Sequence, residues 1–266
     1  MSKLTILALL IVAQYRPIIL NSNYQHDKWQ NKPTDIVKRF SAYTVSFDGK
    51  DDDYALGVPE WVAYEIKPLK GKRLGKRPES PNVWISERRF PADASYRNSE
   101  FDRGQMCAGF IAWRLGKDAY WNTHTILNAC PQFPVFHRGI WFDLEKFTVE
   151  WADKTGQSVW VICGPVFMQM AELSWIGEKK DVAVPDAFYK IIVQEQKGQP
   201  DVMAFMYPHL EKYSQKGPYH HAKYLVSVNY IEMLTGLDFF TVLEDKLEER
   251  IESRRPRRLW GELSKK

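Results

Sequence analysis

The middle of the chain brings together residue types that could bind an anion, hold a metal ion and exchange a proton. Arg103 stands two positions before Gln105, and His137 stands eight positions before Glu145. Arginine binds phosphate oxygens through paired hydrogen bonds. Histidine exchanges a proton near neutral pH and also binds transition metals. Glutamine has no basic nitrogen at neutral pH, so Gln105 could only orient a neighbouring group.

Two strands are predicted around the first of these residues. Gly104 and the small residues after it suit a strand that another segment approaches closely. The stretch from Thr123 to Ala129 is rich in β-branched residues and predicts a second strand. Pro131 and Pro134 should end that strand, because proline cannot donate a hydrogen bond to its neighbour.

A helix is predicted to follow, between Arg138 and Lys154. Apolar residues recur there at helical spacing, at Ile140, Trp141, Leu144, Phe147, Thr148 and Trp151. Eight positions correspond to about two helical turns, so His137 and Glu145 would lie on one side of this helix. The region therefore reads as a strand, a long connection, a second strand and a helix.

The order of these residues resembles the DNA/RNA non-specific endonuclease family, over residues 58 to 245. The matching motifs are Asp102-Arg103-Gly104-Gln105, Asn128, Pro131-Gln132, Trp141 with Leu144-Glu145, Gly164-Pro165-Val166-Phe167, Pro185 to Lys190 and Ser227 to Phe240. The resemblance implies an α+β protein with the ββα-metal (His-Me finger) nuclease fold, in which helices flank a central mixed or antiparallel sheet.

The resemblance also implies an activity and a set of roles. The family hydrolyses phosphodiester bonds of DNA and RNA without sequence specificity and uses one divalent metal ion, magnesium. Arg103 would lie near the scissile phosphate, or would form an ion pair with Asp102 or another carboxylate, and Glu145 would support the water shell of the metal. Arg88 and Asn128 would contact the substrate, with Arg89 as the alternative to Arg88, and Asn128 could instead satisfy buried backbone groups. DNA or RNA is the implied partner, and some relatives form homodimers.

Two positions depart from the family. Gln105 occupies the place of the histidine that serves as general base, and His137 occupies the place of the asparagine that binds the metal. Loss of a general base costs about 10²- to 10⁴-fold in rate, so weakened or altered catalysis is expected. Histidine would shift metal preference towards manganese or zinc, or His137 and Gln105 have exchanged roles. The alternative is a catalytically inactive nucleic-acid-binding relative.

Other histidines and the cysteines allow further interpretations. His124 is a second candidate base, although a histidine in a strand is more often structural. His220 and His221 are interpreted as surface residues. If the two strands pair, Cys107 and Cys130 would face each other, either as a disulfide or as buried thiols.

Composition and flanking segments complete the expected organisation. Hydrophobic residues make up 44% of the chain, which indicates a globular protein, and the net charge of +4 suits a polyanion partner. We expect a signal peptide at 1–13 (or a buried first strand), a linker at 14–37, an endonuclease-like domain at 38–252 and a basic tail at 253–266. Export would place the protein outside the cell or in the periplasm; without it, a cytoplasmic protein is expected. No other segment is apolar enough to span a bilayer, so no membrane partner is expected.

Several local features lie outside the central motif. Val83 to Ile85 is predicted as a short strand, and Lys67 to Arg77 as a basic loop that contacts phosphates or is merely solvated. The acidic triplet Asp51 to Asp53 is interpreted as a solvated turn. The basic tail is interpreted as a disordered end or as a contact to nucleic acid by charge.

Overall fold

A seven-stranded sheet forms the centre of the molecule. The computed structural model describes residues 36–47, 55–71, 74–86, 90–168, 172–213 and 217–261. Each neighbouring pair in the sheet is antiparallel. The strands follow the order β1 (Ile36–Arg39), β2 (Tyr43–Phe47), β3 (Pro59–Ile66), β6 (Val159–Val166), β9 (Ala187–Gln196), β10 (Gln199–Pro208) and β11 (Leu225–Val226).

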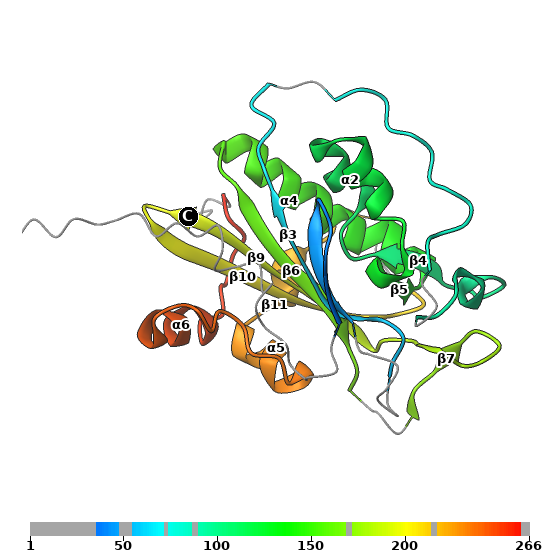
Figure 1. Ribbon diagram of the computed structural model, residues 1–266. Coiled ribbons are helices and arrows are strands. Elements are labelled where there is room, and N and C mark those ends of the chain that lie inside the picture. Colours follow the sequence, from blue (N-terminus) through cyan, green and yellow to red (C-terminus); the bar gives the residue numbers. More distant parts are fainter. Residues whose placement is uncertain are drawn as a thin grey trace, which may run out of the picture.

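Helices cover both faces of this sheet (Figure 1). The helices α2 (Lys117–Asn122) and α4 (Phe142–Thr155) lie on one face, and α5 (Val228–Thr235) and α6 (Asp245–Glu252) lie on the other. Central strands are buried on both sides, because successive residues point to opposite faces. In β6, Val161 belongs to the core beneath α4, whereas Ile162 belongs to the core beneath α5 and α6. The expected α+β architecture with an antiparallel sheet and flanking helices is confirmed.

The central motif forms a separate ββα unit beside the large sheet. Strand β4 (Asp102–Gln105) pairs antiparallel with β5 (Ala129–Gln132). Between them lie α1 (Gly109–Ala112), α2 and two 3₁₀ turns at Trp113–Leu115 and Ile126–Asn128. After β5 the chain passes through α3 (Pro134–Phe136) and a π-helical turn (His137–Trp141) into α4.

Two glycines are required where other groups approach the backbone closely. A Cβ atom on Gly104 would lie 2.1 Å from the side-chain oxygen of Gln132, on the paired strand. A Cβ atom on Gly139 would lie 2.6 Å from the hydroxyl oxygen of Tyr219. Gly139 also has non-helical backbone angles (φ −103°, ψ −111°), and it widens the turn from which His137 projects.

The predicted second strand was placed too early. Thr123 to Asn128 forms a turn and a 3₁₀ turn, in which the Thr125 hydroxyl accepts a hydrogen bond from Leu127 N at 3.4 Å. The strand is Ala129–Gln132 and includes Pro131, opposite Arg103, where we expected proline to end it. A two-stranded ribbon leaves one edge of each strand unpaired, so a proline without an N–H fits there.

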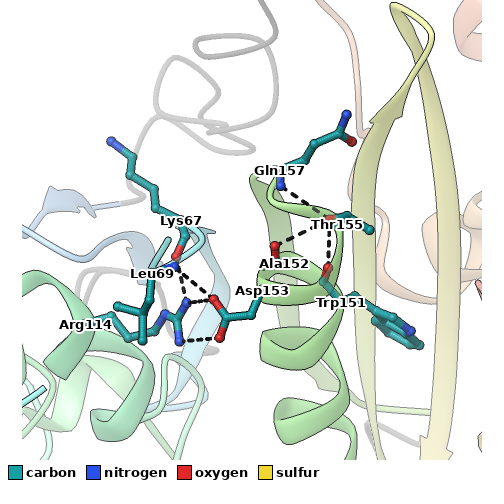
Figure 2. Close-up of polar contacts among 8 residues, drawn as sticks. All are labelled: Lys67, Leu69, Arg114, Trp151, Ala152, Asp153, Thr155 and Gln157. Atoms are coloured by element: carbon teal, nitrogen blue, oxygen red, sulfur yellow. Dashed lines mark hydrogen bonds and ion pairs between the residues drawn. The ribbon is translucent and has the colours of Figure 1, made fainter. Parts of the chain in front are cut away.

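The C-terminal end of α4 is anchored to the rest of the ββα unit by one carboxylate (Figure 2). Asp153 accepts hydrogen bonds from the guanidinium of Arg114 at 2.5 and 3.1 Å and from Leu69 N at 2.9 Å. Arg114 also donates to Lys67 O at 2.8 Å. Burial raises the pKa of Asp153, but Arg114 and Leu69 N outweigh it and hold the pKa below its ordinary value. The contact joins the segment after β3, the connection between β4 and β5, and α4, the helix that carries Glu145.

Two other expectations are decided by the structure. Val83 to Ile85 forms only an isolated bridge, between Ile85 and Thr125. All three cysteines are free, buried thiols, so Cys107 and Cys130 do not form a disulfide. Burial raises the pKa of both thiols.

The predictions for the two ends of the chain have different outcomes. The expected signal peptide, most of the linker and the acidic triplet Asp51 to Asp53 lie outside the described residues. The described part of the tail is not a free end: Arg254 pairs with Asp201 at 2.9 Å, and Trp260 packs edge-on against Trp151 with ring centroids 5.3 Å apart. None of the described helices has both the length and the apolar character to cross a bilayer.

Candidate functional site

A cavity of about 320 Å³ opens between the end of β4, the start of α1 and the start of α4. It is lined by four of the residues singled out from the sequence, which are Gln105, His124, His137 and Glu145. Arg77 and Arg138 add positive charge at its wall. Two larger cavities, of about 640 and 980 Å³, contain none of the predicted site residues. The fold therefore brings the central residues of the motif to one place.

Gln105 is held rigidly by the backbone around it. Its amide nitrogen donates to the carbonyl oxygen of Thr123 at 3.1 Å and to the Thr123 hydroxyl at 3.0 Å. Its amide oxygen accepts from Gly109 N at 2.8 Å. Both donor hydrogens are used, so the side chain orients α1 and the Thr123 turn. An amide in this position has no basic nitrogen to offer to water.

His137 is oriented by a carboxylate. Its Nδ1 lies 2.9 Å from Asp102 Oδ2, and the guanidinium of Arg138 donates to both oxygens of the same carboxylate at 2.6 and 2.8 Å. Burial raises the pKa of Asp102, but hydrogen bonds from His137 and Arg138 outweigh it and hold the pKa below its ordinary value. An ionised Asp102 keeps the proton of the neutral His137 ring on Nδ1, so that Nε2 carries an available lone pair.

Glu145 is buried beside a lysine. Its carboxylate is 3% exposed and lies 3.5 Å from Lys190 Nζ, which is fully buried and lies 3.9 Å from the ring centroid of Trp141. Lys190 belongs to β9 and reaches across from the large sheet to α4. Burial raises the pKa of Glu145, and the charge of Lys190 opposes that rise. The pair places a compensated carboxylate at the floor of the cavity.

Arg103 and Asn128 are close in sequence to residues that line the cavity, but their side chains contact other groups. Arg103 pairs with Asp93, donates to Asn82 O at 3.1 Å and lies 5.0 Å from the ring centroid of Trp84. Asn128 is fully buried.

Each polar atom of the Asn128 side chain bonds to backbone. Its amide oxygen accepts from Cys107 N at 2.8 Å, and its nitrogen donates to the carbonyl oxygens of Cys107 and Thr123 at 2.9 and 3.0 Å. Arg103 and Asn128 are not among the described residues that line the cavity. Arg88 and Arg89 lie outside the described residues.

Of the other histidines singled out from the sequence, His124 and His221 make structural contacts and His220 is exposed. His124 lies in a turn after α2 rather than in a strand, with Nδ1 3.1 Å from Tyr120 O and Nε2 3.3 Å from the Ser80 hydroxyl. Burial lowers its pKa. His221 was wrongly assigned to the surface: it is buried between the Tyr207 hydroxyl, 2.8 Å from Nδ1, and Asp143, 3.2 Å from Nε2. His220 is exposed as expected.

The cavity offers two side chains of types that bind divalent ions. His137 Nε2 and the Glu145 carboxylate are the donors that could face an ion, because Gln105 is committed to the backbone. No group of three or more His, Cys, Asp or Glu side chains with metal-binding geometry occurs among the described residues. An imidazole whose other nitrogen bonds a carboxylate is a common ligand arrangement for zinc and related metals.

Two residues of the site were not identified from the sequence. Asp102 was not predicted to contact His137, and Lys190 was matched only as part of a downstream motif. A charged residue inside an otherwise apolar strand was the available signal for Lys190, because lysine is almost never fully buried without a partner. Nothing in the spacing indicated that its partner would be Glu145, 45 positions away.

Comparisons with known proteins identify the family. The DNA/RNA non-specific endonuclease family model matches residues 24–246. The chain is 31% identical over 193 residues to mitochondrial endonuclease G of Bos taurus, covering 67% of this chain and 62% of that protein. It is 26% identical over 239 residues to a nuclease of Nostoc sp., covering 84% of this chain and 79% of the other.

A solved structure shares the fold. A chain in a crystal structure of the EndoG/EndoGI complex superposes with a TM-score of 0.67 at 24% identity, covering 79% of this chain and 88% of that one. The fold and the matched motifs define a ββα-metal nuclease-type protein. This chain belongs to the DNA/RNA non-specific endonuclease family. It spans 62% of the length of the bovine endonuclease G that it matches.

Proposed function

We propose that this protein is a divalent-metal-dependent, sequence-nonspecific endonuclease in which His137 replaces the missing base of the family. The contact that carries the proposal is His137 Nδ1 to Asp102 Oδ2 at 2.9 Å. It leaves Nε2 of His137 unprotonated in the neutral ring, at the wall of the cavity that also contains Glu145. Gln105 supports the backbone of the site and takes no proton.

The chemistry required is hydrolysis of a phosphodiester. The oxygen of a water molecule bonds to phosphorus, its proton passes to a base, and the bond from phosphorus to the leaving oxygen breaks. In the proposed mechanism, His137 Nε2 accepts that proton. A divalent ion would stabilise charge on the phosphate and the leaving oxygen. Manganese and zinc suit an imidazole ligand better than magnesium does.

The charged residues around the cavity support DNA or RNA as the substrate. Arg77 and Arg138 line it, and Lys67, Lys70 and Lys76 belong to the neighbouring basic segment. Such side chains attract the phosphate backbone irrespective of sequence. Arg103 remains a candidate phosphate ligand only if substrate displaces its contact with Asp93. Secretion and a homodimer stay predictions.

A second function is favoured by the environment of Gln105. Its three hydrogen bonds make it a structural residue, as expected if the site has lost its base. A relative that binds nucleic acid without cutting it would keep the basic wall of the cavity and need no titratable group there. This is the alternative that the first experiment must separate.

The experiment is plasmid cleavage by the purified full chain with magnesium, manganese or zinc. Wild type is compared with His137→Ala and Gln105→His, and His220→Ala serves as the matched control because His220 is an exposed histidine outside the cavity. We expect His137→Ala to lower the rate about 10²- to 10⁴-fold and His220→Ala to leave it unchanged.

The outcomes separate the two functions. Cleavage by wild type that survives in His137→Ala contradicts the assignment of His137. An inert wild type that Gln105→His activates supports the non-cutting relative instead. If His137 is confirmed, loss of one limb of the pH–rate profile in His137→Ala indicates a base, whereas rescue of His137→Ala by higher metal concentration indicates a ligand.

A further inference from the structure

Two phenylalanine side chains line the cavity. Phe142, at the start of α4, is 40% exposed, and Phe110, from α1, is half-buried. Their rings meet edge to face with centroids 5.5 Å apart, and both line the cavity together with His137. Isolated exposed apolar side chains are ordinary. This pair differs because it places aromatic surface in the cavity that also contains His137 and Glu145.

Cations flank this aromatic pair. Lys146 Nζ lies over the ring of Phe142, 5.1 Å from its centroid and one turn along α4, and it also pairs with Asp143 at 3.0 Å. The side chain of Arg138 is 71% exposed, although its guanidinium bonds Asp102. An aromatic face with cations beside it is the arrangement that proteins use to bind single strands: the base stacks on the ring and the phosphates meet the charges.

We propose that the Phe142–Phe110 pair stacks one unpaired base of the strand whose phosphate enters the cavity. This inference rests on the proposed function and adds a specificity to it: the protein prefers single-stranded or locally unpaired nucleic acid. In a duplex the faces of each base are covered by its neighbours, so a ring can stack only after a base leaves the helix. The cavity, about 320 Å³, is at the small end for ligand sites and suits a single nucleotide better than a duplex.

The test measures binding in EDTA, so that no strand is cut. The probe is a short single-stranded DNA with one central 2-aminopurine, whose fluorescence falls when the base stacks, and a hairpin duplex of the same sequence is the comparison. Variants are Phe142→Ala and Phe142→Trp. The matched control is Phe147→Ala, because Phe147 is 37% exposed on the same helix, stacks on Trp151, and is not among the described residues lining the cavity.

We expect wild type to quench 2-aminopurine and to bind the single strand more tightly than the hairpin. Phe142→Ala should weaken single-strand binding about 5- to 100-fold, the range for loss of one stacked base, and should abolish quenching. Phe142→Trp should retain both, and Phe147→Ala should behave as wild type. Thermal unfolding of each variant identifies any loss of binding that comes from misfolding.

Failure of the inference is distinct from failure of the proposed function. If wild type binds both probes with the salt dependence of phosphate contacts, but Phe142→Ala and Phe147→Ala bind equally well, the stacking role is wrong and the nuclease proposal stands. If Phe142→Ala weakens hairpin and single strand by the same factor without a change in quenching, the role is also wrong. If wild type binds neither probe, nucleic acid is not the substrate and both proposals fall.

Discussion

Two glutamates, on opposite faces of the large sheet, are buried in opposite electrostatic surroundings. Glu145 of α4 is 3% exposed and has the ammonium group of Lys190 at 3.5 Å. Glu252 of α6 is 8% exposed, and its Oε1 has no hydrogen-bond partner among the described residues. Its charged neighbours include Glu232, Glu248 and Asp238, all acidic. One carboxyl group is compensated by a cation and the other is not.

The pKa values follow from that difference. Burial raises the pKa of Glu145, while Lys190 opposes the rise. Burial and then the charge of Glu232 both raise the pKa of Glu252, to about 8. Near neutral pH, Glu252 therefore keeps a proton and hydrogen-bonds to Glu232, which holds the negative charge of the pair. In this comparison, Lys190 of the large sheet compensates the buried carboxylate of Glu145 at the floor of the candidate site, whereas the charged neighbours that raise the pKa of Glu252 are acidic.

The largest effect is expected from removing that cation. Lys190→Met keeps the length of the side chain but leaves Glu145 buried without a partner, which costs about 3–5 kcal/mol in the free energy of unfolding. The pKa of Glu145 should rise further, so the native state binds a proton that the unfolded state releases at neutral pH. Stability should then fall as pH increases above about 4.5, the ordinary pKa of a glutamate. Urea unfolding at several pH values measures this.

The double variant Lys190→Met with Glu145→Gln decides whether charge or packing is responsible. Replacement of both charges should restore much of the lost stability, because a buried ion pair can often be replaced by neutral groups at little cost. A double variant as unstable as Lys190→Met alone would show that Lys190 matters through its contact with Trp141, and the comparison with Glu252 would lose its basis.

A smaller effect of opposite sign is expected at Glu252. Its folded pKa, about 8, lies above the ordinary value of 4.5, so the native state binds more protons than the unfolded state between these pH values. Its contribution to stability is therefore present at low pH and is lost as pH rises through about 8. Glu252→Gln should stabilise the protein by about 1–2 kcal/mol at pH 9 relative to wild type and should have little effect at pH 5.

Thermal unfolding at the two pH values tests this prediction. Glu249→Gln is the matched control, because Glu249 is an exposed glutamate of the same helix. Equal changes in both variants would mean that the effect comes from the net charge of α6 rather than from burial of Glu252.

The sequence was most informative where a local signal was strong. The helical period after Arg138 predicted α4 closely. The strand predicted at Thr123 failed because β-branched residues also suit turns when their hydroxyls bond to backbone, as those of Thr123 and Thr125 do.

The candidate site was predictable in its members and not in its contacts. The motif brought Gln105, His137 and Glu145 to one cavity. It gave no indication that His221 and Lys190 would pair with Asp143 and Glu145, because those partners come from a helix far away in sequence. Long-range pairing of this kind depends on how α4 packs on the sheet, and local periodicity carries no information about that packing.

The smallest effect sharpens the comparison on a single helix. Lys154 Nζ lies 3.0 Å from Glu150, a shorter separation than the 3.5 Å between Lys190 and Glu145, and both glutamates belong to α4. If distance decided the strength of an ion pair, Lys154→Met would cost more than Lys190→Met. Both partners of the Lys154 pair are more than half exposed, at 73% and 51%. Water therefore screens their attraction, and we expect Lys154→Met to lower the free energy of unfolding by about 0.5 kcal/mol or less.

This loss of stability should vanish in high salt, whereas that of Lys190→Met should persist. Urea unfolding of the two variants at low and high salt tests this directly. A Lys154→Met loss as large as that of Lys190→Met would mean that burial is not what distinguishes the pair at the site.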